Sequence, residues 1–192
     1  MGKIIISTNM TLDGVVQDPD GAEGFRHGGW FARFGGADLE ARFKGFDDEA
    51  RGTEALLLGR ESDAWFGTRW LTREGELAAR LNGLPKYVVS STLEAPAWTN
   101  VTVLRGDIVD EVTRLKNELD GDIVVYASYQ LGRALLEHDL VDELRLCVFP
   151  VVLGDGERLF GATTDAKPIR LVDSRTIGDN LTYLTYEVLR DV

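Results

Sequence analysis

The sequence has little of the chemistry that disulfides and metal sites require. Its 192 residues include one cysteine, Cys147, and two histidines, His27 and His138. A single cysteine cannot form an internal disulfide, and Cys147 lies in an apolar run where a small buried side chain is expected. The two histidines are far apart in the sequence. We therefore expect no metal site.

Long apolar runs and a basic surface are also missing. No stretch approaches the roughly 20 apolar residues that span a bilayer. Asp and Glu outnumber Lys and Arg by 32 to 21, which gives a formal net charge of −11. Such a field repels nucleic-acid phosphates and anionic lipids. The sequence therefore predicts a cytoplasmic protein with no nucleic-acid partner and no membrane partner.

Strand and helix patterns alternate along the chain, and then strands follow alone. Apolar, β-branched runs predict strands over residues 3–8, 54–58, 86–90, 101–104, 122–126, 144–152, 169–177 and 181–189. Helical periodicity predicts helices over 37–51, 62–70, 74–82, 107–119 and 128–137, and a long functional loop over 9–36. No repeat or linker interrupts this order, so we expect a single domain over residues 1–192. The order predicts a mostly parallel sheet covered by helices, with an antiparallel C-terminal edge.

Three predicted strands end in residues that suit an anionic ligand. Gly59-Arg60-Glu61-Ser62 follows the second strand, Ser90-Ser91-Thr92 follows the third, and Ala127-Ser128 precedes a helix. Parallel strands end at one edge of a sheet, where helix N-termini, hydroxyls and guanidinium groups bind phosphate. Each motif alone is also typical of a turn, a helix cap or a surface ion pair.

The order and spacing of several motifs resemble a known family. The motifs are Thr11-Leu12-Asp13-Gly14, Gly59-Arg60-Glu61-Ser62, Lys86 to Leu93, Ala127-Ser128 and Leu140 to Leu144, followed by Phe149 to Phe160. With them the chain resembles the dihydrofolate reductase-like superfamily, and within it the reductase domain of the bifunctional deaminase-reductases of riboflavin biosynthesis. The resemblance extends from Lys3 to about Leu189 and implies a three-layer α/β/α fold.

The resemblance implies NADPH-dependent reduction by hydride transfer in a protein that forms a homodimer and acts on a small-molecule substrate. Gly59, Arg60 and Ser62 would flank the adenosine half of the cofactor, and Ser90 and Ser91 would bind its 2′-phosphate. The segment Ala127, Ser128, Tyr129, Gln130 and Leu131 would hold the pyrophosphate, and Asp13 and Gly14 would belong to a loop that closes over the nicotinamide. Val151, Leu153 and Gly154 would line the substrate side.

Two departures from the family pattern affect the cofactor site. Dihydrofolate reductase has Gly-Gly with a cis peptide bond at the pyrophosphate turn, whereas this chain has Ala127-Ser128. We take retention of the cis bond as a hypothesis, although a non-proline cis bond costs ~3 kcal/mol. Glu61 lies beside Arg60, where a carboxylate weakens binding of a 2′-phosphate and leaves open the choice between NADP and NAD.

A proton source is harder to assign from the sequence. Asp13 and Asp47 are the candidate catalytic acids. Asp13 equally fits a turn before Gly14, and Asp47 equally fits a solvated acidic surface. A helical projection places Asp47 at the border of the apolar stripe and directs Asp48 and Glu49 away from it. Trp30 is a candidate for stacking on a flat substrate ring.

The leading hypothesis is an NADPH-dependent oxidoreductase acting on a pteridine or a ribosylaminopyrimidine. The same residues leave two alternatives open: a non-catalytic nucleotide- or flavin-binding protein, and a reductase of an unrelated small molecule.

Overall fold

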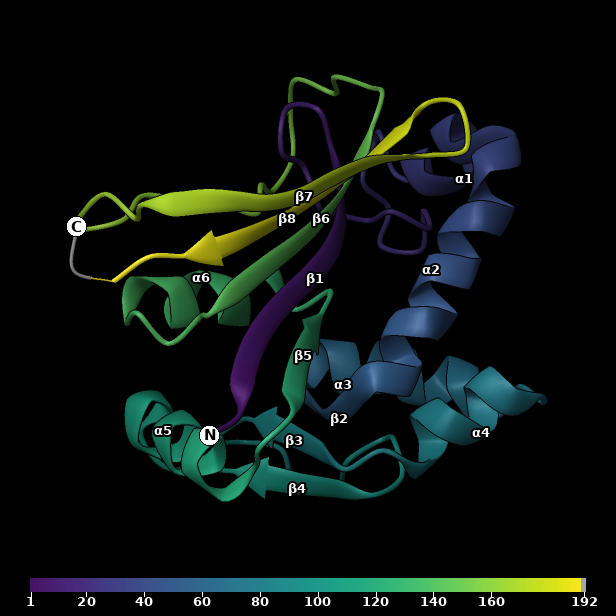
Figure 1. Cartoon of the computed structure of the whole chain (residues 1–192). Coiled ribbons are helices and arrows are strands. Elements are labelled where there is room, and N and C mark those ends of the chain that lie inside the picture. Colours follow the sequence, from purple (N-terminus) through teal and green to yellow (C-terminus); the bar gives the residue numbers. More distant parts are fainter. Residues whose placement is uncertain (191–192) are drawn as a thin grey trace.

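A computed structural model describes residues 1–190 and contains one eight-stranded sheet (Figure 1). The strand order is β4-β3-β2-β5-β1-β6-β8-β7. The six strands from β4 to β6 are mutually parallel, and β8 and β7 are antiparallel to their neighbours. Their bounds are β1 Lys3–Thr11, β2 Thr53–Gly59, β3 Lys86–Val89, β4 Val101–Leu104, β5 Asp122–Tyr126, β6 Glu143–Phe149, β7 Ile169–Ile177 and β8 Leu181–Val188.

Helices cover both faces of the sheet. They are α1 Trp30–Gly35, α2 Leu39–Gly52, α3 Arg60–Trp70, α4 Glu76–Gly83, α5 Ile108–Glu118 and α6 Tyr129–Glu137, with a 3-10 turn at Gly36–Asp38. Alternate residues of β1 face opposite ways, as a pleated strand requires. Ile4 and Ile6 pack with α5 and α6, whereas Ile5 packs with α2, α3 and α4. This arrangement confirms the predicted three-layer α/β/α fold.

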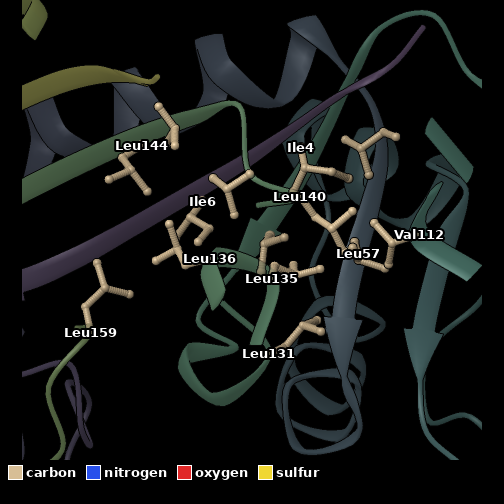
Figure 2. Packing of buried hydrophobic residues seen from close by; sticks show 14 of the residues in the cluster. Ile4, Ile6, Leu57, Val112, Leu131, Leu135, Leu136, Leu140, Leu144 and Leu159 are labelled. Carbon is tan, nitrogen blue, oxygen red and sulfur yellow. The ribbon is translucent and has the colours of Figure 1, made fainter. Parts of the chain in front are cut away.

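The core explains why the central strands are apolar on both faces. Leu131, Leu135 and Leu136 of α6 point toward Ile4 and Ile6 of β1 (Figure 2). Each of these side chains is less than 9% exposed. Truncating a leucine in such a packed layer to alanine costs about 2–5 kcal/mol. The hydrophobic runs in the sequence are therefore the signature of a sheet buried between two helix layers.

The predicted elements are mostly present, with shifts at their ends. The strand predicted over 3–8 continues to Thr11, and the predicted loop 9–36 contains α1. Asp107 caps α5, because its carboxylate accepts hydrogen bonds from the N–H groups of Val109 and Asp110. Asp38 precedes α2 but makes no capping bond. Its carboxylate instead accepts hydrogen bonds from the N–H groups of Asp179 and Asn180 in the β7–β8 turn.

The chain crosses to opposite faces of the sheet after β1 and β5. The connection after β1 leads to α2 on one face, and β5 leads directly to α6 on the other face. Because β1 and β5 are neighbours, a topological switch point lies between their carboxyl ends. Ligands bind at such points in open α/β sheets. Among the helices of residues 1–190, none is long and apolar enough to cross a membrane.

Candidate functional site

Two strand–helix junctions are bonded together at the carboxyl edge of the sheet. The Ser128 hydroxyl, before α6, accepts a hydrogen bond of 3.0 Å from the backbone N–H of Gly59, before α3. It donates at 2.8 Å to the hydroxyl of Ser62 in the first turn of α3. A Cβ on Gly59 would lie 3.8 Å from the Ser128 hydroxyl, so the two junctions are in contact. The structure thus brings together Gly59, Ser62 and Ser128, as predicted.

The turn between β5 and α6 has an unusual backbone. Ala127 has a φ of +56°, in the left-handed region that alanine rarely adopts. The Ser128 N–H donates to the Tyr126 carbonyl and the Tyr129 N–H donates to the Ala127 carbonyl, so two tight three-residue turns follow each other. No peptide bond among residues 1–190 is cis. The hypothesis of a cis bond at Ala127–Ser128 is therefore wrong, and a left-handed alanine makes the turn instead.

The first turn of α6 presents backbone donors at the same edge. The first N–H groups of a helix have no partner within the helix and carry part of its positive pole. Tyr129 is half-buried and Gln130 is exposed. The Leu131 side chain lies in the core, so it faces no ligand, and only its backbone is available at this edge. The N-terminus of this nine-residue helix therefore offers backbone N–H groups to an anion.

Arg60 and the turn after β3 form the outer part of this edge. An Arg60 Nη lies 3.5 Å from the Thr92 hydroxyl, and its other N–H groups are held by the Glu61 carboxylate at 2.8 and 3.2 Å. The Ser90 hydroxyl accepts bonds from the N–H groups of Thr92 and Leu93, and it thereby shapes the turn. Ser91 is exposed beside it. Arg60, Ser90 and Ser91 lie together, but the Arg60 guanidinium already donates two hydrogen bonds to the Glu61 carboxylate.

Arg105 is a basic residue at this edge that the sequence analysis missed. Its guanidinium donates to the carbonyls of Ser91 and Leu93. It follows the last residue of β4, and the same rule that singled out the ends of β2 and β3 would have found it.

Asp13 joins the loops that follow β1 and β6. Its carboxylate accepts hydrogen bonds from the Thr11 hydroxyl at 2.7 Å and from the N–H groups of Leu153 and Gly154 at 3.2 and 2.9 Å. Burial raises the pKa of Asp13, but these hydrogen bonds outweigh burial and the pKa lies below its ordinary value. Asp13 is therefore ionised at neutral pH, and it positions the 153–154 turn.

The remaining predicted residues of this loop pair lie beside Asp13. Gly14, with a φ of +82°, forms the turn that follows it. Leu153 is half-buried and Gly154 is exposed. Val151 packs against the apolar cluster that includes Trp30 of α1 and Phe149 of β6. These residues form the loops after β1 and β6, next to the switch point.

Asp47 and Trp30 are both engaged in contacts within the chain. Asp47 is on α2 and pairs with Arg51 at 2.7 Å, one helical turn later. Trp30 is fully buried, donates its indole N–H to the Gln17 carbonyl and packs against Phe149. Stacking of Trp30 on a substrate ring is therefore not supported, because the side chain belongs to the core.

Glu49 corrects the helical projection of α2. The projection directed it away from the sheet, yet its side chain is only 5% exposed. Its carboxylate accepts hydrogen bonds from the hydroxyls of Ser7 and Tyr126 at 2.9 and 3.0 Å and pairs with Arg145 at 3.2 Å. The face of the sheet beneath this part of α2 is polar, so an apolar stripe does not mark the inward side.

The crevice at the switch point is nearly closed. About 10 Å³ of space is enclosed there by residues of β1, β5, the Ala127 turn and the loop after β6: Ile6, Thr8, Val125, Ala127, Ser128, Tyr129 and Leu159. That volume is close to one water molecule. The hydrogen-bond donors are thus assembled at the edge, while the space for a ring is shut in this conformation.

Comparison with known proteins gives consistent matches over nearly the whole chain. The model of the family described as RibD C-terminal domain matches residues 2–183. The uncharacterized protein YyaP of Bacillus subtilis is 28% identical over 191 residues, which cover 96% of this chain and 94% of that protein.

Solved structures show the same fold. A putative riboflavin biosynthesis protein from Shewanella sp. PV-4 has a TM-score of 0.75 and 22% identity, with 98% of this chain and 99% of that chain covered. Dihydrofolate reductase from Enterococcus faecalis, solved with NADP(H), has a TM-score of 0.63 and 14% identity, with 97% and 96% covered. The predicted dihydrofolate reductase-like fold is confirmed.

Proposed function

Since the chain belongs to the RibD C-terminal domain family and has a reductase-type fold, we propose that it is an NADPH-dependent reductase. The proposed substrate is a flat, nitrogen-rich ring of the pteridine or ribosylaminopyrimidine kind, as in riboflavin biosynthesis. The family match supports the reductase class, and the named similarity to dihydrofolate reductase with NADP(H) supports the cofactor.

The observation that carries the proposal is the joined edge of Gly59, Ser62 and Ser128 beside the N-terminus of α6. A dinucleotide diphosphate is multiply charged, and the chain as a whole is strongly acidic. Binding therefore requires local donors that offset the repulsion. Helix N–H groups, the Ser62 hydroxyl and the Arg60 guanidinium supply such donors on one edge.

The residues present fit the cofactor chemically. Bound NADPH supplies the hydride. The chain's own task is to hold the diphosphate at the Ala127–Leu131 turn and to exclude water from the reacting ring. Because the crevice at the switch point holds only about 10 Å³, the residues that line it have to move apart before a ring enters.

Asp13 has a positioning role in this proposal. Its lowered pKa and its three hydrogen bonds commit it to the turn at Leu153 and Gly154, on the proposed substrate side. Water then supplies the proton. The commitment of Asp13 to this turn also favours the second candidate, a nucleotide-binding protein without turnover.

Fluorescence titration with NADPH and NADH, followed by assays on the ribosylaminopyrimidine and on dihydrofolate, tests the proposal. We expect saturable NADPH binding and oxidation of NADPH with one of these substrates. Binding without turnover on either substrate supports the second candidate or a different substrate. Failure of NADPH to bind at millimolar concentration contradicts both the cofactor and the enzyme assignment.

We further propose that the protein is a homodimer joined through β7. This strand is at the edge of the sheet, and eight of its nine residues are exposed. Ile169, Leu171 and Val172 are large apolar side chains on it, exposed by 43%, 51% and 61%. A long edge strand with apolar side chains is a site for pairing with a second strand.

A further inference from the structure

The turn after β3, residues 90–93, contacts two arginine side chains. The Arg60 guanidinium, at the start of α3, is 3.5 Å from the Thr92 hydroxyl. The Arg105 guanidinium, directly after β4, donates hydrogen bonds to two backbone carbonyls of the turn. Because β3 and β4 are parallel neighbours, their carboxyl ends lie side by side at this edge of the sheet. Two separate elements thus bring a positive charge to one short turn.

The charges of these two arginines are compensated differently. The Glu61 carboxylate lies 2.8 Å from the Arg60 guanidinium and offsets its charge. Arg105 forms no ion pair among residues 1–190, and the partners of its guanidinium are neutral carbonyls. Asp107, the acid nearest to it in the sequence, accepts hydrogen bonds from the first turn of α5 and caps that helix. The positive charge of Arg105 is therefore the one that remains available at this turn.

Hydroxyl groups of the same turn are available as donors. The Ser90 hydroxyl accepts hydrogen bonds from the N–H groups of Thr92 and Leu93, and it fixes the shape of the turn without a ligand. Ser91 and Thr92 are exposed, and neither hydroxyl donates a hydrogen bond within the part of the chain that the structure describes. Hydroxyls and guanidinium groups both donate to phosphate oxygens. The turn therefore presents several donors beside one uncompensated positive charge.

A phosphate monoester is the ligand that these groups fit. It carries about two negative charges at neutral pH and has three acceptor oxygens. A guanidinium binds such a group through parallel hydrogen bonds. The chain as a whole has a formal net charge of −11, so a phosphate requires a local positive charge in order to bind.

The place of the turn in the sheet indicates what this phosphate is attached to. Strand β2 lies between β3 and β5, so the turn is two strand spacings, about 10 Å, from the junction of β5 and α6. In the proposed function, the diphosphate of the cofactor binds at that junction. The 2′-phosphate of NADPH is attached to the ribose next to the diphosphate, so one bound molecule reaches both places along this edge.

We propose that Arg105 selects NADPH over NADH by binding the 2′-phosphate, together with the exposed hydroxyls of Ser91 and Thr92. This inference rests on the proposed function, because it specifies which cofactor the same edge prefers. Arg60 adds less in the wild type, since Glu61 already holds its guanidinium. NADH lacks the 2′-phosphate and therefore gains nothing from Arg105.

Isothermal titration calorimetry of the full chain with adenosine 2′,5′-bisphosphate and with AMP tests this assignment. The two probes differ only in the 2′-phosphate, and neither contains a nicotinamide, so the nearly closed crevice at the switch point does not affect the comparison. We expect the wild type to bind the bisphosphate at least ~10-fold more tightly than AMP. Arg105→Gln should remove most of this difference and leave AMP binding unchanged. Arg73→Gln, which removes an exposed arginine beyond the other end of α3, should keep the difference.

Two further variants separate recognition of the phosphate from support of the turn. Arg105→Lys keeps the charge but not the planar fork that donates to two carbonyls, so it should keep part of the preference for the bisphosphate. If Arg105 only supported the turn, lysine would be as harmful as glutamine. Glu61→Gln in the Arg105→Gln background should restore part of the preference, because it frees the Arg60 guanidinium.

The outcomes distinguish this inference from the proposed function. Equal affinity of the wild type for the two probes overturns the role of Arg105, as does an equal loss of both probes in Arg105→Gln. If Arg105→Gln does not fold, Ser91→Asp decides: a carboxylate beside Arg105 should abolish the preference, and an unchanged preference overturns the role. NADPH oxidation with an unchanged preference in Arg105→Gln contradicts only the role of Arg105. Selective bisphosphate binding without NADPH oxidation supports that role and favours the nucleotide-binding protein without turnover.

Discussion

The hydroxyl of Ser128 accepts a hydrogen bond of 3.0 Å from the backbone N–H of Gly59, a residue 69 positions earlier in the chain. This single bond ties the β2–α3 junction to the β5–α6 junction. The same hydroxyl also donates to Ser62. The edge that we propose to bind a diphosphate is therefore preorganised by the chain itself, without a ligand.

Removal of this hydroxyl should affect both stability and cofactor binding. Ser128→Ala leaves the Gly59 N–H without its partner, which costs about 1–3 kcal/mol for a buried donor. We expect a loss of about 1–2 kcal/mol in the free energy of unfolding and a roughly 10-fold weaker affinity for NADPH. Urea unfolding and fluorescence titration measure the two effects. Ser174→Ala, at an exposed position on β7, is the control and should change neither.

The left-handed backbone of Ala127 predicts an unusual order of stabilities at that position. A left-handed conformation costs an L-residue about 1–2 kcal/mol, whereas glycine adopts it freely but loses about 0.4–1 kcal/mol through its flexible unfolded chain. We expect Ala127→Gly to be neutral or stabilising by up to about 1 kcal/mol, and Ala127→Val to be destabilising by more than about 1 kcal/mol.

Ala134, on α6 itself, is the matched control for this series. There the backbone is helical, and Ala134→Gly should destabilise by about 1 kcal/mol. Urea unfolding of the two glycine variants should thus give effects of opposite sign or clearly different size. Equal losses at both positions would contradict the strain argument.

Glu61 should set the preference between NADPH and NADH. Its carboxylate binds the Arg60 guanidinium through two N–H groups, and a 2′-phosphate has to compete for them. We expect Glu61→Gln to lower the dissociation constant of NADPH by roughly 3–10-fold, with little change for NADH, and we expect the effect to shrink at high salt. Glu76→Gln removes the same charge far from this edge. An equal gain in that variant would show a general charge effect and contradict the local one.

The parts of the site that follow from apolar strand patterns were predicted from the sequence. Parallel strands buried on both faces, such as the Ile4–Ile6 stretch, are recognisable from apolar runs alone. Because parallel strands end at one edge, the meeting of Gly59, Ser62 and Ser128 followed from the strand assignments. Gly178, which lies between the predicted strands 169–177 and 181–189, has a φ of +60°, a backbone angle that glycine favours.

The inward position of Glu49 was not predictable from an apolar stripe. A helical projection assumes that the covered face of a helix is hydrophobic, but α2 lies over Ser7 and Arg145. Arg42 and Glu49 are seven residues apart, so they share a face, and both are buried. A positive and a negative side chain seven residues apart were the feature of the sequence that could have indicated this buried polar face. The substrate-stacking role predicted for Trp30 was missed for a different reason. A tryptophan in a glycine-rich loop gives no sign of whether the loop folds into the core.

Lys86 predicts a pH dependence of stability. It is 1% exposed, and its ammonium group donates to the carbonyls of Asn82 and Leu84. Burial lowers the pKa of Lys86 from 10.5 to about 8. Between these two values the unfolded chain binds more protons than the folded chain, so the free energy of unfolding rises with pH. The slope of this rise is at most about 1.4 kcal/mol per pH unit. Below about pH 8 Lys86 is protonated in both the folded and the unfolded chain, so its titration adds no slope there.

Urea unfolding from pH 7 to pH 10 checks this dependence. The difference between the wild type and Lys86→Met should grow as pH rises above about 8. Lys44→Met, at an exposed position on α2, should run parallel to the wild type. Parallel curves for Lys86→Met would contradict the assignment.

The exposed edge strand gives the last prediction. Ile169 and Leu171 lie on one face of β7, because they pair with Val188 and Tyr186 of β8, and Leu171 is 51% exposed. A second copy related by two-fold symmetry would place the same strand antiparallel to β7, and the two apolar rows would then bury each other. In sedimentation equilibrium we expect the wild type at twice the chain mass of 21.2 kDa. Leu171→Lys places a charge in that interface and should give the monomer. Phe43→Lys, at another exposed apolar side chain on α2, should remain a dimer, and a monomeric wild type would rule out the β7 interface altogether.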